Sequence, residues 1–434
     1  MFSNISSSDS IDNANIIEAI SKTNRKLASV QRIVSISEIP GADRIEVAQV
    51  LGWQCVVAKK DNFKVGDLVV YIETDSVLPQ LPVFEFLRER KFRVRTIKLR
   101  KQISEGLIMP LSILPLETEQ FCGNMLVTWN NMKGKEAEDA KKIPIEEGLD
   151  LTNIIGVIKH DPEGKLEQSL IEKEKRGPVM RFAMGIPAFR WLYLKLNSNI
   201  KGNFPPWIAK SDENRIQTYA KLIMEHYDEE WEITEKLDGQ SATFFVHPMK
   251  VWGRKKVVFG VCSRNIWMKT PSDNKYWQSA KKFKVKESLL KTFDNVYIQA
   301  EQCGPGIQAN KYKLQNIEIY VFNLVIDGCK APYKTIAEWC KDQFDWNKDV
   351  DCLIKPVPLV KDSFIPAKEI GNNKSVMEVV QYMVNLSQGD SALLPRPREG
   401  IVCRLKSNPN ISLKIINPLF KIEQEKEEDK EDKE

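Results

Sequence analysis

The chain has 434 residues, of which 42% are hydrophobic and 28% are charged; this is the balance of a globular protein with room for two domains. No apolar run is long enough to cross a bilayer, and the polar start at residues 1–15 does not resemble a secretory signal. The first feature excludes a membrane span and the second argues against secretion, so we expect a cytoplasmic or nuclear location.

The cysteines and histidines give little basis for a metal or disulfide framework. Eight cysteines occur without any C-x-x-C pair, and there are only three histidines. We therefore expect the cysteines to be reduced packing residues. The scarcity of histidine also directs attention to lysines and carboxylates as the groups that could carry chemistry.

Charge is unevenly distributed along the chain. The net charge is +5, but the last fourteen residues contain four Lys against eight Asp or Glu and so contribute −4. The remaining residues therefore carry +9, which weakly favours a polyanionic partner.

In chain order, residues 1–25 are polar and predicted to be disordered. Residues 26–115 contain short β-rich runs separated by turn signals such as Pro40-Gly41 and Val65-Gly66. Closely spaced short strands of this kind predict a small β-barrel.

A basic run lies within this predicted barrel. Residues 88–101 hold eight Lys or Arg and a single acid, which is suited to neutralising nucleic-acid phosphates without reading the bases. A solvated strand face is the alternative reading. The candidates for phosphate contact are Arg93, Arg95, Lys98 and Arg100.

The rest of the chain divides into three parts. Residues 116–200 show weak periodicity and high charge, and we interpret them as a connector or insert. Residues 201–420 resume a mixed pattern of strands and helices, which predicts the larger domain. Residues 421–434 read as a solvated, disordered tail.

The segment Glu235-Lys236-Leu237-Asp238-Gly239 is the most informative one for chemistry. A lysine can act as a nucleophile only when it is deprotonated, and it needs a desolvated or cation-rich setting for that. The motif K-x-D-G is short enough to occur by chance, and an exposed turn is the ordinary interpretation when it stands alone.

Five further segments follow in order and change that interpretation. They are Cys262-Ser263-Arg264-Asn265, Tyr297-Ile298-Gln299-Ala300-Glu301, Val321-Phe322-Asn323, Glu399-Gly400-Ile401-Val402 and Ser412-Leu413-Lys414-Ile415-Ile416-Asn417. The ordered set resembles the signature motifs of the covalent nucleotidyltransferases, the superfamily of polynucleotide ligases and RNA capping enzymes.

The resemblance implies a role for each matched residue. Lys236 would form a covalent lysyl-adenylate, Arg264 would contact the nucleotide or the RNA phosphate, and Lys414 would neutralise the α-phosphate. Phe322 would stack on adenine. The implied metal residues are Asp238, Glu301 and Glu399, and the implied nucleotide-binding residues are Lys210, Glu235, Glu301, Phe322 and Glu399.

The surroundings of the motifs are similar to one subgroup, the RNA ligases that join 3′-hydroxyl to 5′-phosphate ends. DNA ligases and capping enzymes carry a barrel after the last motif, whereas only twenty residues follow Lys414 here and the barrel precedes the motifs. Ile416 occupies a position where many ligases have a second lysine. The resemblance implies an α+β fold: an N-terminal oligonucleotide-binding (OB) barrel followed by a nucleotidyltransferase domain of antiparallel sheets with flanking helices.

The expected activity is ATP-dependent RNA ligation through an adenylylated 5′ end, with Mg²⁺ or Mn²⁺ as cofactor. The expected partner is RNA, either a nicked duplex or broken ends, and we expect a monomer that does not bind membranes. Two alternatives are a DNA ligase or capping enzyme, and a non-catalytic OB-fold RNA-binding protein.

Overall fold

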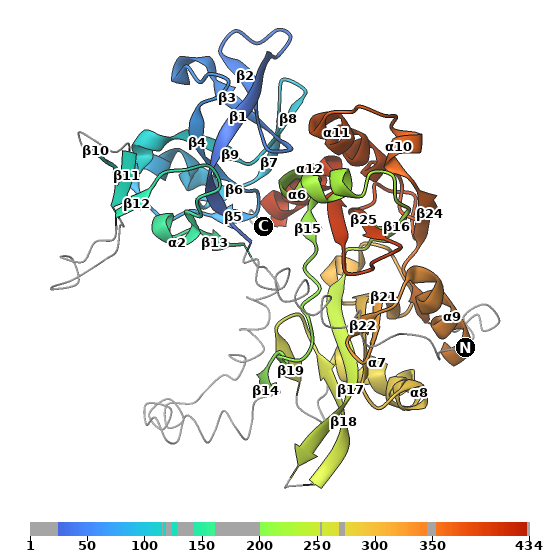
Figure 1. Cartoon of the computed structure of the whole chain (residues 1–434). Coiled ribbons are helices and arrows are strands. Elements are labelled where there is room, and N and C mark those ends of the chain that lie inside the picture. Colours follow the sequence, from blue (N-terminus) through green and yellow to red (C-terminus); the bar gives the residue numbers. More distant parts are fainter. Residues whose placement is uncertain are drawn as a thin grey trace, which may run out of the picture.

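The computed structural model describes residues 25–114, 116–118, 124–127, 142–160, 200–251, 254–268, 274–344 and 353–431. Figure 1 shows an N-terminal barrel module in blue beside a larger domain built from two sheets. The predicted α+β fold class is confirmed. No helix among the described residues is long and apolar enough to span a membrane.

The barrel module is a curled five-stranded sheet in the order β3-β2-β1-β4-β9. Its strand β1 is buried on both sides, because Val30 packs into one apolar cluster and Ile33 into another. The module contains β1 (Ala28–Glu38), β2 (Ile45–Val50), β3 (Trp53–Ala58), β4 (Leu68–Ile72), β5 (Ser76–Val77), β6 (Arg93–Val94), β7 (Thr96–Leu99), β8 (Gln102–Glu105) and β9 (Leu107–Pro110), with 3-10 helices η1 (Lys59–Asp61), η2 (Pro82–Arg90) and η3 (Leu111–Ile113).

The described end of the expected connector packs on this module. The Val30 N–H donates to Leu149 O at 2.9 Å, and Leu151 is fully buried in the same core. The described elements of this region are β10 (Leu116–Thr118), β11 (Asn124–Val127), β12 (Lys142–Pro144), α2 (Thr152–Ile155) and β13 (Ile158–Lys159). Residues 145–160 are thus part of the barrel module, and residues 161–199 lie outside the described chain.

The first sheet of the larger domain has the order β14-β19-β18-β17-β20-β21-β22, with β23 paired to β21. Its strands are β14 (Ile200–Asn203), β17 (Gln240–Val251), β18 (Arg254–Cys262), β19 (Ile266–Met268), β20 (Val296–Cys303), β21 (Glu318–Ile326), β22 (Cys329–Lys330) and β23 (Ile354–Pro356). Alternate residues Ala242, Phe244 and Val246 face the helices α7 (Lys275–Lys282), α8 (Val285–Thr292) and α9 (Tyr333–Phe344). The 3-10 helix η5 (Gln308–Asn310) joins β20 to β21.

The second sheet has the order β15-β26-β25-β16-β24. It comprises β15 (Asn214–Arg215), β16 (Trp231–Lys236), β24 (Leu359–Phe364), β25 (Gly400–Leu405) and β26 (Ser412–Ile416), covered by α6 (Ile216–Glu225) and α11 (Val376–Ser387), with α10 (Pro366–Glu369) nearby. Trp231, Ile233 and Ile401 are fully buried beneath α6 and α11. The pairing is antiparallel except between β15 and β26.

The prediction that residues 421–434 form a disordered tail is wrong for most of that segment. Residues Pro418–Glu431 form helix α12, which lies between the barrel module and the larger domain in Figure 1. The Glu425 carboxylate accepts a hydrogen bond from the Thr96 N–H at 3.2 Å, and Glu425 is buried. Composition alone indicated solvation, but this helix has the neighbouring module as a packing partner.

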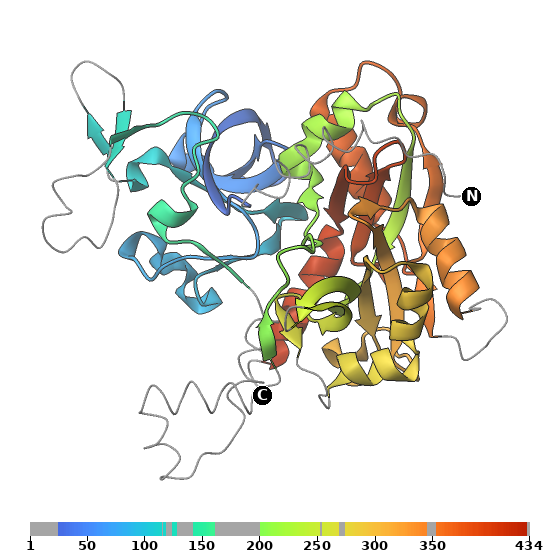
Figure 2. The same ribbon diagram turned by 60° about the horizontal axis from the view of Figure 1, so that its bottom comes forward.

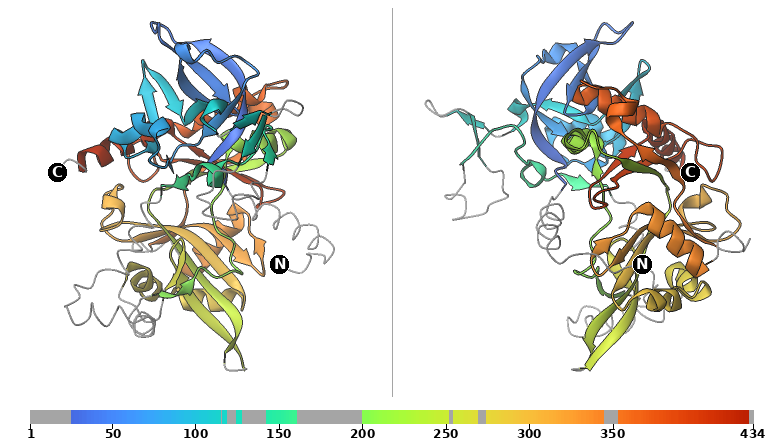
Figure 3. Two further views of the ribbon diagram at one scale, coloured as in Figure 1. Left: turned by 90° about the vertical axis from the view of Figure 1, so that its left-hand side faces the viewer. Right: turned by 45° about the vertical axis from the view of Figure 1, so that its right-hand side comes forward.

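The two units meet through several direct contacts, and Figures 2 and 3 show them side by side. The Gly52 N–H donates to Gln217 O at 2.8 Å, and the Trp53 indole donates to Thr218 Oγ1 at 3.2 Å. A Cβ at Gly52 would stand only 2.8 Å from the Gln217 Cα. The barrel module is therefore closely docked where α6 begins.

Candidate active site

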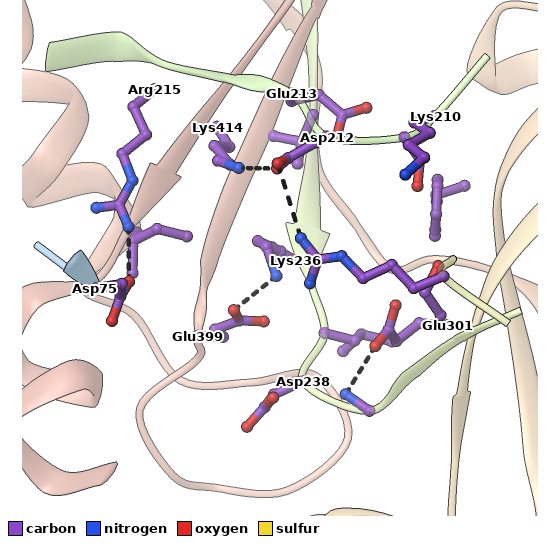
Figure 4. A pocket seen from close by; sticks show the side chains of 18 of the residues that line it. Asp75, Lys210, Asp212, Glu213, Arg215, Lys236, Asp238, Glu301, Glu399 and Lys414 are labelled. Carbon is purple, nitrogen blue, oxygen red and sulfur yellow. Dashed lines mark hydrogen bonds and ion pairs between the residues drawn. The ribbon is translucent and has the colours of Figure 1, made fainter. Parts of the chain in front are cut away.

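The main pocket lies between the two sheets of the larger domain and is closed on one side by the barrel module. Its volume is about 470 Å³, within the range usual for small-molecule sites. Figure 4 shows side chains from β16, β20, β25 and β26 converging on it. Every residue expected to bind nucleotide or metal lines this pocket: Lys210, Glu235, Lys236, Asp238, Arg264, Glu301, Phe322, Glu399 and Lys414.

Lys236 is the last residue of β16 and points into the pocket. The strand places it there because Trp231 and Ile233 anchor the opposite face in the core beneath α6 and α11. The Lys236 Nζ donates to Glu399 Oε1 at 2.6 Å. The amine is therefore enclosed in the pocket beside a carboxylate.

The charge state of Lys236 follows from three carboxylates. Burial by itself lowers the pKa of the Lys236 amine, but attraction by Glu399, Glu301 and Asp238 outweighs burial and raises the pKa above its usual value. The amine is thus protonated at neutral pH in the protein alone. An attacking amine needs these carboxylates to be neutralised.

Gly239 packs closely against β20, because a Cβ at this position would lie 2.5 Å from Gln302 O. Its N–H donates to Glu301 Oε1 at 2.9 Å, and the Asp238 N–H donates to the Tyr312 hydroxyl at 2.8 Å. These bonds hold the K-x-D-G segment against β20 and fix the Glu301 side chain.

Lys414 belongs to a second ionic group in the upper part of the view in Figure 4. Its Nζ lies 2.5 Å from Asp212 Oδ1, and Asp212 also pairs with Lys159 at 3.2 Å and Arg264 at 3.7 Å. Burial lowers the pKa of Lys414 to about 8 although Asp212 opposes that shift. The three cations form a wall suited to phosphate oxygens.

Glu235 and Phe322 lie in the same pocket. Glu235 Oε2 accepts the Ala392 N–H at 2.9 Å, while the buried Oε1 has no hydrogen-bond partner among the described residues. Burial raises the pKa of this carboxyl. Phe322 is half-buried in β21. A partly exposed aromatic ring and the unsatisfied Glu235 acceptor in the same pocket suit a nucleobase.

The four residues expected to grip RNA do not form one exposed face. Lys98 and Arg100 are exposed and Arg95 is half-buried, but Arg93 is buried and its guanidinium lies 3.6 Å from Asp75. Arg93 turns toward the junction with the larger domain and lines the pocket, and contact of these four residues with RNA phosphates stays a prediction.

Sequence reasoning missed several residues in or beside the pocket. Lys421 lies 3.5 Å from Asp75, and Lys421, Lys159 and Arg25 line the pocket. Lys311 pairs with Asp238, which lines the pocket. All four fall outside the matched motifs, and no local pattern marks them, because they reach the site only through the docking of the barrel module and the loop before β21.

Comparison with known proteins gives two family matches. The family model described as an OB-fold domain matches residues 27–111, and the one described as RNA ligase matches residues 229–422. The larger domain therefore carries an RNA ligase family domain over residues 229–422. A search of curated protein sequences finds no match.

Solved structures of the RNA ligase of Naegleria gruberi are similar to this ligase over nearly the whole chain. Its complex with pyrophosphate is 26% identical with a TM-score of 0.66, covering 93% of this chain and 99% of that one. A mutant with AMP and manganese is also 26% identical with a TM-score of 0.66, covering 92% and 98% respectively. A further mutant with ATP and manganese has the same identity and TM-score, covering 91% and 98%.

Proposed function

We propose that this RNA ligase uses ATP to seal 3′-hydroxyl and 5′-phosphate RNA ends through a lysyl-AMP on Lys236. The observation that carries the proposal is the enclosure of the Lys236 amine, 2.6 Å from Glu399, in a pocket that Lys414 and Arg264 also line. The ATP complex of the Naegleria enzyme supports ATP as the nucleotide.

In the first step the neutral Lys236 Nζ attacks the α-phosphorus of ATP. A P–N bond forms, the bond to the β-phosphate oxygen breaks, and pyrophosphate leaves. Lys414 and Arg264 stabilise the negative charge that develops on the phosphate oxygens. Their present anion, Asp212, gives way to the triphosphate.

Carboxylate oxygens suit the proposed Mg²⁺ or Mn²⁺. Among the described residues no three acidic, His or Cys side chains are grouped closely enough to bind a metal by themselves, so nucleotide phosphates and water must complete the coordination. Glu399 has a buried Oε2 without a hydrogen-bond partner in the described chain, and together with Glu301 and Asp238 it fits that role. When bound, the cation screens the carboxylates and favours the neutral amine.

Adenine selection follows from the unsatisfied Glu235 Oε1. This buried acceptor receives a hydrogen bond from the exocyclic amine of adenine, whereas guanine would present an acceptor there and leave both groups unpaired. Phe322 provides the aromatic face on which the base stacks.

Two transfers complete the cycle. An oxygen of the RNA 5′-phosphate attacks the lysyl-AMP phosphorus, the P–N bond breaks, and AMP is joined to the RNA end by a pyrophosphate bond. The RNA 3′-hydroxyl then attacks the 5′-phosphate phosphorus, a phosphodiester bond forms, and AMP leaves. We propose a nicked duplex as the substrate, since a barrel and a basic domain that flank one pocket can hold both arms of an A-form helix.

The test is to incubate the protein with α-labelled ATP and Mg²⁺ and to look for acid-labile label on the denatured chain. We expect label on the wild type and on Lys334→Ala, an exposed lysine of α9, but none on Lys236→Ala. Label that persists in Lys236→Ala would refute the assignment. Sealing of nicked RNA but not of nicked DNA would then separate an RNA ligase from a DNA ligase.

A further inference from the structure

The long hairpin formed by β17 and β18 extends beyond the body of the larger domain, at the end opposite the barrel module (Figures 1 and 3). At one end Ser241 and Thr243 of β17 line the pocket. At the other end the ladder closes with the pairs Lys250↔Lys255 and Val251↔Arg254. The hairpin therefore connects the pocket to a remote surface.

Four exposed cations, Lys250, Arg254, Lys255 and Lys256, gather at that remote end, and we call them the distal cations. Unlike half-buried lysines elsewhere, such as Lys374 beside Glu378 and Lys406 beside Glu230, none of the four has an ion-pair partner within the described ranges. The sequence offers none nearby either, since no Asp or Glu occurs between Asp238 and Asp273.

The register of the hairpin places like charges together. Lys250 and Lys255 are directly opposite each other, an arrangement that destabilises a ladder unless an anion is bound. Alternation puts Lys256 and Arg254 on the face of β18 that also carries Gly260 and Cys262, and Lys250 and Lys255 on the reverse face. The end of the hairpin is thus positive on both faces.

We infer that the distal cations bind phosphates of the RNA duplex about one helical turn away from the ends being joined, an inference that rests on the proposed ligase function. Nine residues separate Ser241 at the pocket from Lys250, which is about 30 Å of strand. A double helix completes a turn in roughly that length, about ten base pairs. In a duplex whose nick lies at the pocket, the phosphates at the edge of a groove one turn away therefore lie near the end of the hairpin.

An RNA backbone suits this surface better than a membrane does. Lipid binding needs apolar side chains that insert beside the charges. Among the hairpin residues whose side-chain burial is described, which leaves out 251–253, Val257 is the only large hydrophobic one that is notably exposed, at 40%. Phosphates spaced along a rigid helix instead match cations that are held on a rigid ribbon.

The experiment compares a nicked RNA duplex with two arms of about 18 base pairs with duplexes in which one arm or the other is shortened to about 6 base pairs. Binding is measured by fluorescence anisotropy without ATP. The variant is Arg254→Gln/Lys256→Gln, and the matched control removes two exposed charges from α9 with Lys334→Gln/Lys341→Gln. Both are measured across a salt series.

We expect the wild type and the control to bind the long-armed duplex about tenfold more tightly than the duplex with the relevant arm shortened, and the hairpin variant to lose that preference. The slope of log affinity against log salt should fall by about 2 for the long-armed duplex only. A loss that is equal for both lengths, no loss, or an equal loss in the control would overturn the inference. So would binding to anionic phospholipid vesicles that depends on Arg254 and Lys256 while RNA binding does not.

Self-adenylylation in the absence of RNA separates this inference from the proposed function. If the wild type forms no lysyl-AMP but still shows the arm-length preference that depends on Arg254 and Lys256, the proposed function fails and the RNA surface stands. If lysyl-AMP forms without any such preference, the surface fails and the ligase mechanism stands.

Discussion

The Arg215 guanidinium lies 3.0 Å from the Asp75 carboxylate, so that a residue at the start of α6 is paired with one in the barrel module. Arg93 and Lys421 face the same carboxylate at 3.6 and 3.5 Å. Burial alone raises the pKa of Asp75, but the surrounding cations outweigh burial and hold the pKa well below its usual range. One buried anion thus joins the barrel module, the larger domain and α12.

Replacing Asp75 by Asn should undock the barrel module. The substitution leaves the buried Arg93 and Arg215 and the half-buried Lys421 without their anion, which costs about 3 kcal/mol or more, whereas Asn tolerates the positive φ of 65° at this position. Chemical denaturation should show the loss of stability, and limited proteolysis should cut more rapidly between the units. Asp43→Asn, an exposed carboxylate of the same module, is the control and should behave as wild type. Equal stability of both variants would contradict a docking role.

Removing Asp212 should shift the pH profile of adenylylation. Burial lowers the pKa of Lys414 to about 8, and Asp212 is the group that keeps it from falling further. In Asp212→Asn the Lys414 amine therefore loses its charge at a lower pH. The basic limb of kcat/KM for ATP, which reports the free enzyme, should move down by roughly one unit or more. An unchanged basic limb would mean that Lys414 does not neutralise the α-phosphate.

The sequence was sufficient for the parts of the site that lie within single motifs. Lys236, Glu301 and Glu399 each end or adjoin a buried strand, and hydrophobic runs locate such strand ends without a structure. The same patterns predicted the small barrel and the mixed larger domain, while the full α+β architecture was implied by the family resemblance. Which ordered segments would meet in one pocket came from resemblance to the family, since spacing along the chain does not determine contacts between strands.

The sequence was insufficient to predict the burial and contacts of residues whose positions depend on packing between the two units. Arg93 resembles one more exposed cation in a basic run, yet it is buried at the junction with the larger domain, beside the Asp75 carboxylate that also pairs with Arg215. The acidic composition of residues 421–434 predicts solvation, yet the Glu425 carboxylate accepts a hydrogen bond from the Thr96 N–H of the barrel module. Local composition cannot reveal a partner that is more than three hundred residues away in sequence.

Changing Glu235 to Gln should reduce the preference for ATP over GTP. The wild-type Oε1 is an unsatisfied buried acceptor, which suits the amine of adenine, whereas a Gln amide can donate to the oxygen of guanine. We expect kcat/KM for self-adenylylation with ATP to fall about 10- to 100-fold and the ATP/GTP ratio to narrow. A fall that is the same for both nucleotides would show that Glu235 is structural only.

Changing Glu105 to Gln should stabilise the protein at alkaline pH but not at acidic pH. Glu105 is 8% exposed, and burial raises its pKa to about 7 although Arg215 opposes that shift. Because this carboxyl titrates near 4.5 in the unfolded chain, the folded chain binds more protons between pH 4.5 and 7, and wild-type stability falls as pH rises through that window. Above pH 7 the cost is on the order of 2 to 3 kcal/mol, which the neutral Gln avoids.

Urea denaturation followed by Trp fluorescence should therefore give Glu105→Gln a higher free energy of unfolding than wild type at pH 8 and a similar one at pH 5. Glu89→Gln, an exposed residue of η2, should match wild type at both values. A gain in Glu105→Gln that is equal at pH 5 and pH 8 would show that the side chain is not charged in the folded protein and that its effect is one of packing.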